Sequence, residues 1–213
     1  MISVACVLKS GGYYAADWVA RLQGAVETHL QAPHRFVCLS DVPVPCERIA
    51  LQTDWPGWWA KIELFRAGLF RGPVLYFDLD NVIVGPLDDM IRTAPGMTMV
   101  RDFAGGDRGW HNSSVMSWLG DMSCVHRFLA DRPHVLMQTY QRTRDGRIGD
   151  QALTEDVLCE TGLAVGTFTP GRVVSYKWAA RDGLPEGASV VQFHGKPKPD
   201  QVSADWVRRA WAA

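Results

Sequence analysis

The stretch PVLYFDLDN, residues 73–81, places two aspartates directly after an apolar run. Consecutive β-branched and aromatic residues that follow Gly72-Pro73 are typical of a strand covered on both faces, as the strands of parallel sheets are. Ligands of such sheets bind at the carboxyl ends of the strands. Asp78 and Asp80 follow that end, and the two-residue period of a strand directs both side chains the same way. We therefore predict a ligand site at the mouth of this strand.

Two carboxylates this close repel each other unless a positive charge lies between them. A divalent cation is suited to this position, because it prefers oxygen ligands and keeps coordination positions free for phosphate or water. Aspartates after a strand also form turns and helix caps, and that structural alternative stays open here.

Composition restricts the class of protein. The chain has 213 residues, a formal net charge of -1, 21% charged and 47% apolar residues, which suits one sizeable core and does not favour a nucleic-acid partner. No apolar segment approaches the roughly 18 residues that a membrane span requires. The five cysteines are scattered and lack a C-x-x-C pair, which argues against a disulfide framework and a zinc knuckle. We expect a single cytoplasmic domain over residues 1–213 without a transmembrane segment.

Strands and helices alternate along the chain. Apolar periodicity predicts strands at 2–8, 35–41, 47–51, 96–102, 112–118, 173–178 and 188–195, and helices at 15–31, 58–69, 123–140, 150–162 and 204–213. Pro133 should interrupt the third helix, and Gly162 should end the fourth. Residues 143–150, TRDGRIGD, are predicted to form a mobile loop. This order predicts an α/β fold with a Rossmann-like mixed sheet sandwiched by helices.

Two classes of enzyme use such an aspartate pair. In a nucleotide-sugar glycosyltransferase, the carboxylates hold a cation that bridges the two phosphates of the donor. In a haloacid-dehalogenase-type phosphatase, the first aspartate is the nucleophile and the second is the general acid/base. That family places the pair after its first strand and needs a downstream lysine, whereas here the pair follows about the fourth strand and no lysine occurs between Lys61 and Lys177. The glycosyltransferase is therefore favoured.

Residues 61–90, KIELFRAGLFRGPVLYFDLDNVIVGPLDDM, resemble the glycogenin-like retaining glycosyltransferases, which have a GT-A fold. In that family a lysine opens a helix about seventeen residues before the D-x-D motif, as Lys61 does here. The resemblance continues in the same order through NSSVM (112–116), GDQALTED (149–156) and VVQFHGKPKP (190–199). It covers most of the chain, and four motifs in order are more specific than any one of them.

The resemblance implies a role for each motif. Asp78 and Asp80 are metal ligands, with Mn²⁺ or Mg²⁺ as the cation, and Asp78 also contacts the donor. Structural alternatives stay open for the other positions, above all a helix N-cap at the GDQ aspartate. The implied sites are Lys61 (donor), Asn112 and Ser113 (sugar or acceptor), and Asp150 and Gln151 (catalysis beneath the sugar).

The last motif departs from the family pattern H-x-x-G-x-x-K-P-W. Gln192 stands at the histidine position, while His194 lies two residues later on the same face of the strand. Because imidazole suits manganese better than an amide does, we predict His194 as the third metal ligand. Lys198 matches the phosphate-binding lysine, and Lys196 is a second candidate.

Several aromatic residues are candidates for stacking on sugar rings. Trp55, Trp58, Trp59 and Trp110 are numerous for a core of this size, so some should pack inside and others should line a site. The loop of Trp110 also holds Asp107 and His111.

The sequence thus predicts a metal-dependent glycosyltransferase that moves a hexosyl group from a nucleoside-diphosphate sugar, most simply a UDP-sugar, to a hydroxyl of a glycan or another acceptor. The resemblance implies retention of configuration, with a nucleotide-binding part at about 1–102 and an acceptor part at about 103–213. The alternatives are the phosphatase and a catalytically silent nucleotide-sugar or glycan-binding module, which the altered histidine motif keeps open.

Overall fold

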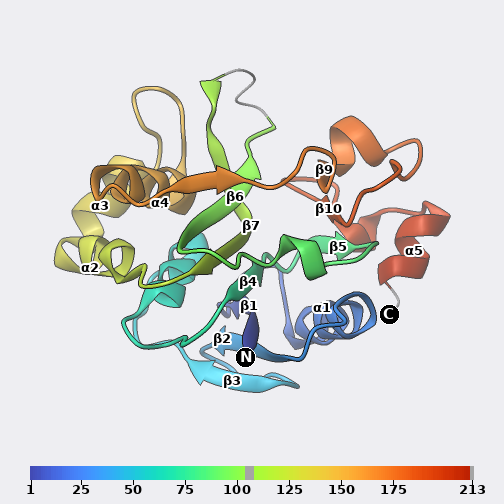
Figure 1. Ribbon diagram of the computed structural model, residues 1–213, viewed down its shortest axis with the longest axis horizontal. Helices are drawn as coiled ribbons and strands as arrows, with labels where there is room; N and C mark the ends of the chain where they lie inside the picture. Colours follow the sequence, from blue (N-terminus) through green and yellow to red (C-terminus); the bar gives the residue numbers. More distant parts are fainter. Residues whose placement is uncertain (104–107, 212–213) are drawn as a thin grey trace.

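A seven-stranded sheet, in the order β3-β2-β1-β4-β7-β6-β8, forms the middle layer of the computed structural model, which describes residues 1–103 and 108–211 (Figure 1). β1 pairs in parallel with β2 and β4, while β7 runs antiparallel to both β4 and β6. The sheet is therefore mixed, as predicted. Its strands are β1 (Ile2–Leu8), β2 (His34–Ser40), β3 (Glu47–Ala50), β4 (Val74–Phe77), β6 (Gly96–Arg101), β7 (His111–Leu119) and β8 (Val165–Thr167).

A second, three-stranded sheet brings the end of the chain to the acidic motif. It consists of β5 (Asn81–Ile83), β10 (Val190–Gln192) and β9 (Val173–Ser175), in the order β5-β10-β9. β10 pairs antiparallel with β5, so that Gln192 lies opposite Asn81, the residue directly after Asp80. Residues that are more than a hundred positions apart in the sequence thereby share one site.

Helices cover both faces of the large sheet. α1 (Ala16–His29) and α5 (Asp205–Trp211) lie on the side of the small sheet, and α2 (Ser123–Asp131), α3 (Pro133–Tyr140) and α4 (Gly149–Glu160) lie on the other. The split between α2 and α3 at Pro133 confirms the predicted interruption. The remaining elements are η1 (Gly57–Phe65), η2 (Asp88–Met90), η4 (Tyr176–Ala180) and η5 (Pro199–Gln201).

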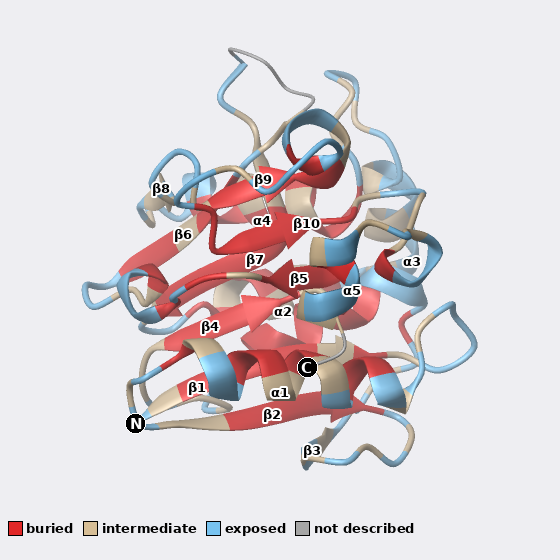
Figure 2. Ribbon diagram, turned by 90° about the vertical axis from the view of Figure 1, so that its right-hand side faces the viewer, coloured by how far each residue is buried: buried red, intermediate tan, exposed pale blue. Residues whose placement is uncertain are grey.

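Strand alternation divides the apolar core into two layers. Val4, Cys6 and Leu8 of β1 pack with α1 on one face, whereas Ala5 packs with η1, α2 and α4 on the other. Figure 2 shows the central strands as buried, whereas the edge strands β3 and β8, the loops and the outer surfaces of the helices hold exposed and intermediate residues. A single α/β domain results, flanked by helices on both sides.

Three predicted elements differ in the structure, and one of them, the strand predicted at 188–195, is confined to β10 at Val190–Gln192. The predicted helix at 58–69 is the 3₁₀ helix η1, which ends at Phe65. Its apolar residues Trp59, Ile62 and Phe65 recur every third position, which is the period of a 3₁₀ helix, and residues 59–65 are buried. The strand predicted at 173–178 ends at Ser175, because the chain turns into the π-helix η4.

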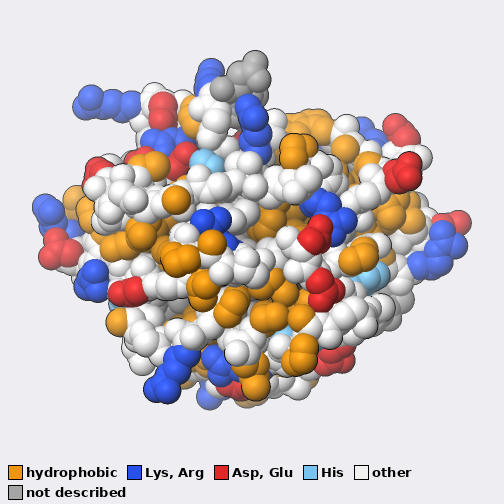
Figure 3. Space-filling model, viewed as in Figure 1, with side chains coloured by type: hydrophobic (Ala, Val, Ile, Leu, Met, Phe, Trp, Pro, Cys, Tyr) orange, Lys and Arg blue, Asp and Glu red, His pale blue; other side chains and the backbone are white. Residues whose placement is uncertain are grey.

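Surface charges are mixed in sign. On the face seen in Figure 3, lysine and arginine side chains are interspersed with aspartate and glutamate side chains. Within residues 1–103 and 108–211, none of the helices combines the length and the apolar character needed to cross a membrane.

Candidate active site

Lys61 joins three of the sequence motifs at one point. η1 buries this lysine, which is 6% exposed, beneath the carboxyl end of β4. Its ammonium nitrogen Nζ lies 3.0 Å from Asp78 Oδ1, 3.1 Å from Asp150 Oδ2 and 3.1 Å from Ser113 Oγ. Although burial opposes the charged form, the carboxylates of Asp150 and Asp78 raise the pKa of Lys61 above its ordinary value. The lysine is therefore a buried cation and not a solvated surface charge.

Asp78 lies on a turn that follows β4. Its backbone N–H donates to Ser114 O at 2.8 Å, and its carbonyl accepts from the Asn81 N–H at 3.2 Å. The Tyr76 hydroxyl donates to Asp78 Oδ1. Burial raises the pKa of Asp78 to about 6, although the Lys61 ammonium opposes this shift. A turn, and not the alternation of a strand, therefore sets the direction of this side chain, which corrects our expectation.

Asp80 has a different set of partners. Its carboxylate, in a residue that is 7% exposed, accepts from the Lys198 ammonium and, at 2.8 Å, from the Tyr14 hydroxyl. Lys198 Nζ also donates to the carbonyl of Phe193 at 3.1 Å. Burial and the adjacent Asp80 charge raise the pKa of Tyr14 far above its ordinary value, so the phenol is a hydrogen-bond donor at neutral pH. Each aspartate of the pair thus holds its own lysine.

Asp150 does not occupy the N-cap of α4. The N-cap position belongs to Ile148, and Asp150 is the second residue of the helix. Its Oδ2 accepts from Ser113 Oγ at 2.6 Å as well as from Lys61. Gln151 Nε2 donates to Asp102 Oδ2 at 3.3 Å. The alternative of a simple helix cap is therefore wrong for Asp150.

The small sheet positions the residues of the altered histidine motif. Gln192 is 4% exposed, and its Nε2 donates to Asn112 Oδ1 at 3.2 Å. His194 Nε2 lies 2.7 Å from Ser175 Oγ, and its ring packs against Phe103 and Trp178. Burial and the charge of a neighbouring lysine lower the pKa of His194, so the imidazole is neutral at neutral pH.

The predicted metal ligands are only partly grouped. Across residues 1–103 and 108–211, no set of three or more His, Cys, Asp or Glu side chains is placed to hold a metal ion. Asp78 and Asp80 do line one cavity together. Their hard oxygen donors fit Mg²⁺ or Mn²⁺, which proteins commonly hold with one or two carboxylates plus substrate phosphates and water.

Two cavities meet at Lys61. The larger has a volume of about 490 Å³, and the smaller has a volume of about 160 Å³. Trp58, Lys61 and Asp78 belong to the walls of both. The larger cavity is also lined by Lys9, Tyr13, Tyr14, Tyr76 and Asp80, and the smaller by Asn112, Ser113, Ile148, Asp150 and Gln151.

The tryptophans divide as expected into core and site residues. Trp55 and Trp59 are buried, whereas Trp58 is 53% exposed. A Cβ added at Gly149 would lie 2.9 Å from Trp58 Nε1, so the start of α4 packs directly against this indole. Trp110 stacks with Arg108, and Asp107 lies outside the described residues.

Two tyrosines were missed in the sequence. Tyr76 precedes Asp78 by two positions in the same motif, and this spacing could have identified it as a partner. Tyr14 follows β1, which is adjacent to β4 in the sheet, so its proximity to Asp80 depends on strand order. The predicted loop at 143–150 is tied to α4 through Arg147, which contacts Asp156 at 2.6 Å.

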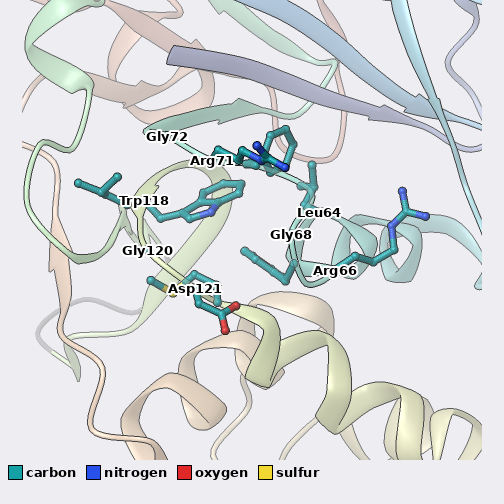
Figure 4. Close-up of a pocket in the computed structure, with 12 residues that line it drawn as sticks. Leu64, Arg66, Gly68, Arg71, Gly72, Trp118, Gly120 and Asp121 are labelled. Carbon is teal, nitrogen blue, oxygen red and sulfur yellow. The ribbon is translucent and has the colours of Figure 1, made fainter. Parts of the chain in front are cut away.

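A further pocket lies at the opposite end of β4 and β7. Its volume is about 340 Å³, and its walls hold none of the predicted metal, donor or catalytic residues. Figure 4 shows the Trp118 indole near Arg71 and Gly72, with Asp121 below it and Arg66 extending away. The chemistry of the D-x-D motif is therefore confined to the other end of the sheet.

The mixed sheet, the covering helices and the position of the acidic pair define a GT-A-type fold. Solved structures of glycosyltransferases match this chain. GlyE of Streptococcus pneumoniae TIGR4 matches with a TM-score of 0.71 and 14% identity over 100% of this chain and 60% of GlyE. The apo form of GlyE matches with a TM-score of 0.66 and 15% identity over 99% of this chain and 59% of GlyE. The galactosyltransferase LgtC in complex with donor and acceptor sugar analogs matches with a TM-score of 0.63 and 13% identity over 99% of this chain and 95% of LgtC.

These structural similarities show the fold of the chain but not its activity. At such identities, the likeness to GlyE and LgtC shows a shared fold alone. The chain spans about three fifths of the length of GlyE. No protein-family model and no curated protein sequence matches the chain. The predicted GT-A architecture is confirmed, and the activity rests on the site.

Proposed function

We propose that this protein transfers a hexosyl group from a nucleoside-diphosphate sugar, with UDP as the nucleotide, to a hydroxyl of a glycan or another acceptor. The observation that carries the proposal is the contact of Lys61 with both Asp78 and Asp150. It unites the aspartate pair with the GDQ helix at the boundary of two cavities. A diphosphate in one cavity and a sugar in the other would place the scissile bond beside these groups.

The larger cavity suits the nucleotide. Mn²⁺ or Mg²⁺ held by Asp78 and Asp80 would stabilise the negative charge that develops on the departing diphosphate. Lys61 and Lys198 supply ammonium groups for phosphate oxygens. Because Nε2 of His194 is hydrogen-bonded with Ser175 Oγ, we assign Asp78 and Asp80 as the protein ligands and leave the other positions to phosphate and water.

The smaller cavity suits the transferred sugar. Asn112, Ser113 and Gln151 offer hydrogen-bonding groups, and Asp150 lies beneath them with its charge balanced by Lys61. We propose retention of configuration, in line with the family resemblance. The cavity walls also support the proposed division of the chain, because residues 7–80 line the larger cavity and residues 112–151 contribute most of the smaller one.

Thermal unfolding with a ligand panel tests the donor. The midpoint is measured with UDP, GDP or inorganic phosphate, each with and without Mn²⁺, for the wild type and for Asp80→Asn. A ligand that binds only the folded state raises the midpoint by mass action. We expect a rise that requires UDP and Mn²⁺ together and is lost in Asp80→Asn. The absence of any nucleotide-dependent rise would remove the donor from the proposal.

Product analysis separates the other functions. A transferase releases UDP from a UDP-sugar, the phosphatase releases inorganic phosphate from a phosphomonoester, and a silent binding module raises the midpoint without turnover.

A cytoplasmic location remains part of the proposal, and it is supported by the five cysteines, all within the described residues and all free thiols.

A further inference from the structure

The carboxylate of Asp80 already carries a cation that belongs to the protein itself. Lys198 Nζ pairs with Asp80 Oδ2, and the two side chains are 15% and 10% exposed. The same ammonium lies 5.5 Å from the centre of the Tyr14 ring and donates to the Phe193 carbonyl. The ion pair is thus enclosed on several sides, and in such surroundings it is screened by water much less than a surface pair.

A divalent cation on Asp80 would compete with this ammonium. The two positive charges repel at close range, and they would share one carboxylate. We therefore expect a bound metal to displace Lys198, whose ammonium needs another anion once it leaves. A nucleoside diphosphate supplies that anion and, at the same time, the oxygen ligands that a site with two carboxylates lacks.

Lys198 is built to move, whereas Lys61 is not. The backbone N–H of Lys198 donates to Gln201 Oε1 at 3.0 Å, so the main chain is held while the flexible side chain can rotate. Lys61 contacts a second carboxylate, that of Asp150, and the Ser113 hydroxyl. If a metal took the Asp78 carboxylate, Lys61 would still be paired with Asp150. If a metal took the Asp80 carboxylate, the one polar contact left among those described for the Lys198 ammonium would be the Phe193 carbonyl.

We propose that Lys198 is an internal counter-ion that keeps divalent cations off Asp80 until a diphosphate arrives, when its ammonium transfers from the carboxylate to a phosphate oxygen. The inference rests on the proposed function, because the diphosphate comes from the donor. It makes metal and nucleotide bind cooperatively, and by linkage each raises the affinity for the other by the same factor. Free metal in the cell then does not saturate the site in the absence of donor.

The test measures Mn²⁺ affinity without nucleotide, by electron paramagnetic resonance of free Mn²⁺, in wild type and in Lys198→Met. We expect the variant to bind Mn²⁺ about 5- to 100-fold more tightly, the usual range of a coupling between sites. In Lys198→Met the gain in Mn²⁺ affinity on adding UDP should shrink by a similar factor. Adding Asp80→Asn to Lys198→Met should abolish the gain, because the freed carboxylate is then gone.

Lys9→Met is the matched control. Lys9 lines the same cavity, but its ammonium pairs with Asp41 and Asp54 at 2.8 Å each. The control removes the same charge without freeing Asp80, so its Mn²⁺ affinity should stay within about twofold of wild type, the size expected for a screened charge at a distance. Circular dichroism melts of each variant establish that it is folded under the conditions of the titration.

The outcomes distinguish the inference from the proposed function. Equal Mn²⁺ affinity in wild type and Lys198→Met, no Mn²⁺ binding to either, or an equal gain in Lys9→Met overturns the role of Lys198, whatever UDP does. If UDP leaves the wild type unchanged in every condition, the proposed donor fails. The Mn²⁺ titrations without nucleotide still decide whether Lys198 competes for Asp80.

Discussion

Lys61→Met should be one of the most destabilising single substitutions at this site. The variant leaves the carboxylates of Asp78 and Asp150 partly or fully buried without the ammonium that lies 3.0 and 3.1 Å from them. At an effective dielectric constant of about 20, each contact contributes roughly 5 kcal/mol before desolvation is counted. Desolvation offsets much of this, and removal of one partner of a buried pair typically costs about 3–5 kcal/mol. We expect a loss of that size in the free energy of unfolding at pH 7.

Urea and thermal denaturation measure this loss. For a chain of this length, it corresponds to a fall in the melting midpoint of roughly 6–20 °C. Lys9→Met is the control with a smaller expected loss, because one partner of Lys9, Asp54, is 97% exposed, and the other, Asp41, is 23% exposed. A second variant, Lys61→Met with Asp150→Asn, removes one of the stranded charges and should recover part of the stability.

The pH dependence gives the same reasoning a second test. Asp78 has a pKa raised to about 6, and loss of Lys61 raises it further. A carboxyl group with a raised pKa in the folded state favours folding below its unfolded pKa, and this contribution disappears as the pH rises through the folded pKa. The deficit of Lys61→Met should therefore be smaller at pH 5 than at pH 8. A deficit below 1 kcal/mol, or one that grows on acidification, refutes the description of Lys61 as a buried counter-ion.

Three further predictions concern the wall of the smaller cavity and its support. Gly149→Ala places a Cβ 2.9 Å from Trp58 Nε1 at a φ of +68°. Its control, Gly162→Ala, has a φ of +71° but open space around the added Cβ among the described residues, and the left-handed backbone alone costs about 1–2 kcal/mol in each. Urea unfolding should therefore show a larger loss of stability for Gly149→Ala than for Gly162→Ala. Trp58→Leu should weaken the binding of methyl pyranosides by about 1 kcal/mol in saturation-transfer NMR, and unchanged binding would remove this indole from the sugar site. Burial opposes ionisation of Glu155, but the hydrogen bond with His111 lowers its pKa. The stability difference between wild type and Glu155→Gln should therefore be present at neutral pH and vanish as acid protonates the carboxyl group. Urea unfolding across pH measures this difference.

Local patterns determined the elements and the place of the site. The apolar run at residues 2–8 predicted the first strand, and Pro133 predicted a break between two helices, because both effects act over a few residues of backbone. The apolar run before Asp78 identified a buried strand and the end at which we expect a ligand to bind. The family resemblance supplied the GT-A architecture, which the structural matches confirm.

Long-range packing decided which charges meet. Sequence spacing does not state that Lys61 contacts Asp150, that Lys198 holds Asp80, or that His194 is engaged by a serine of β9. These pairings depend on the order of strands in two sheets and on a 3₁₀ helix where an α-helix was expected. The free energy of such contacts is realised only when distant segments are brought together, so only the tertiary structure assigns each charge to its partner.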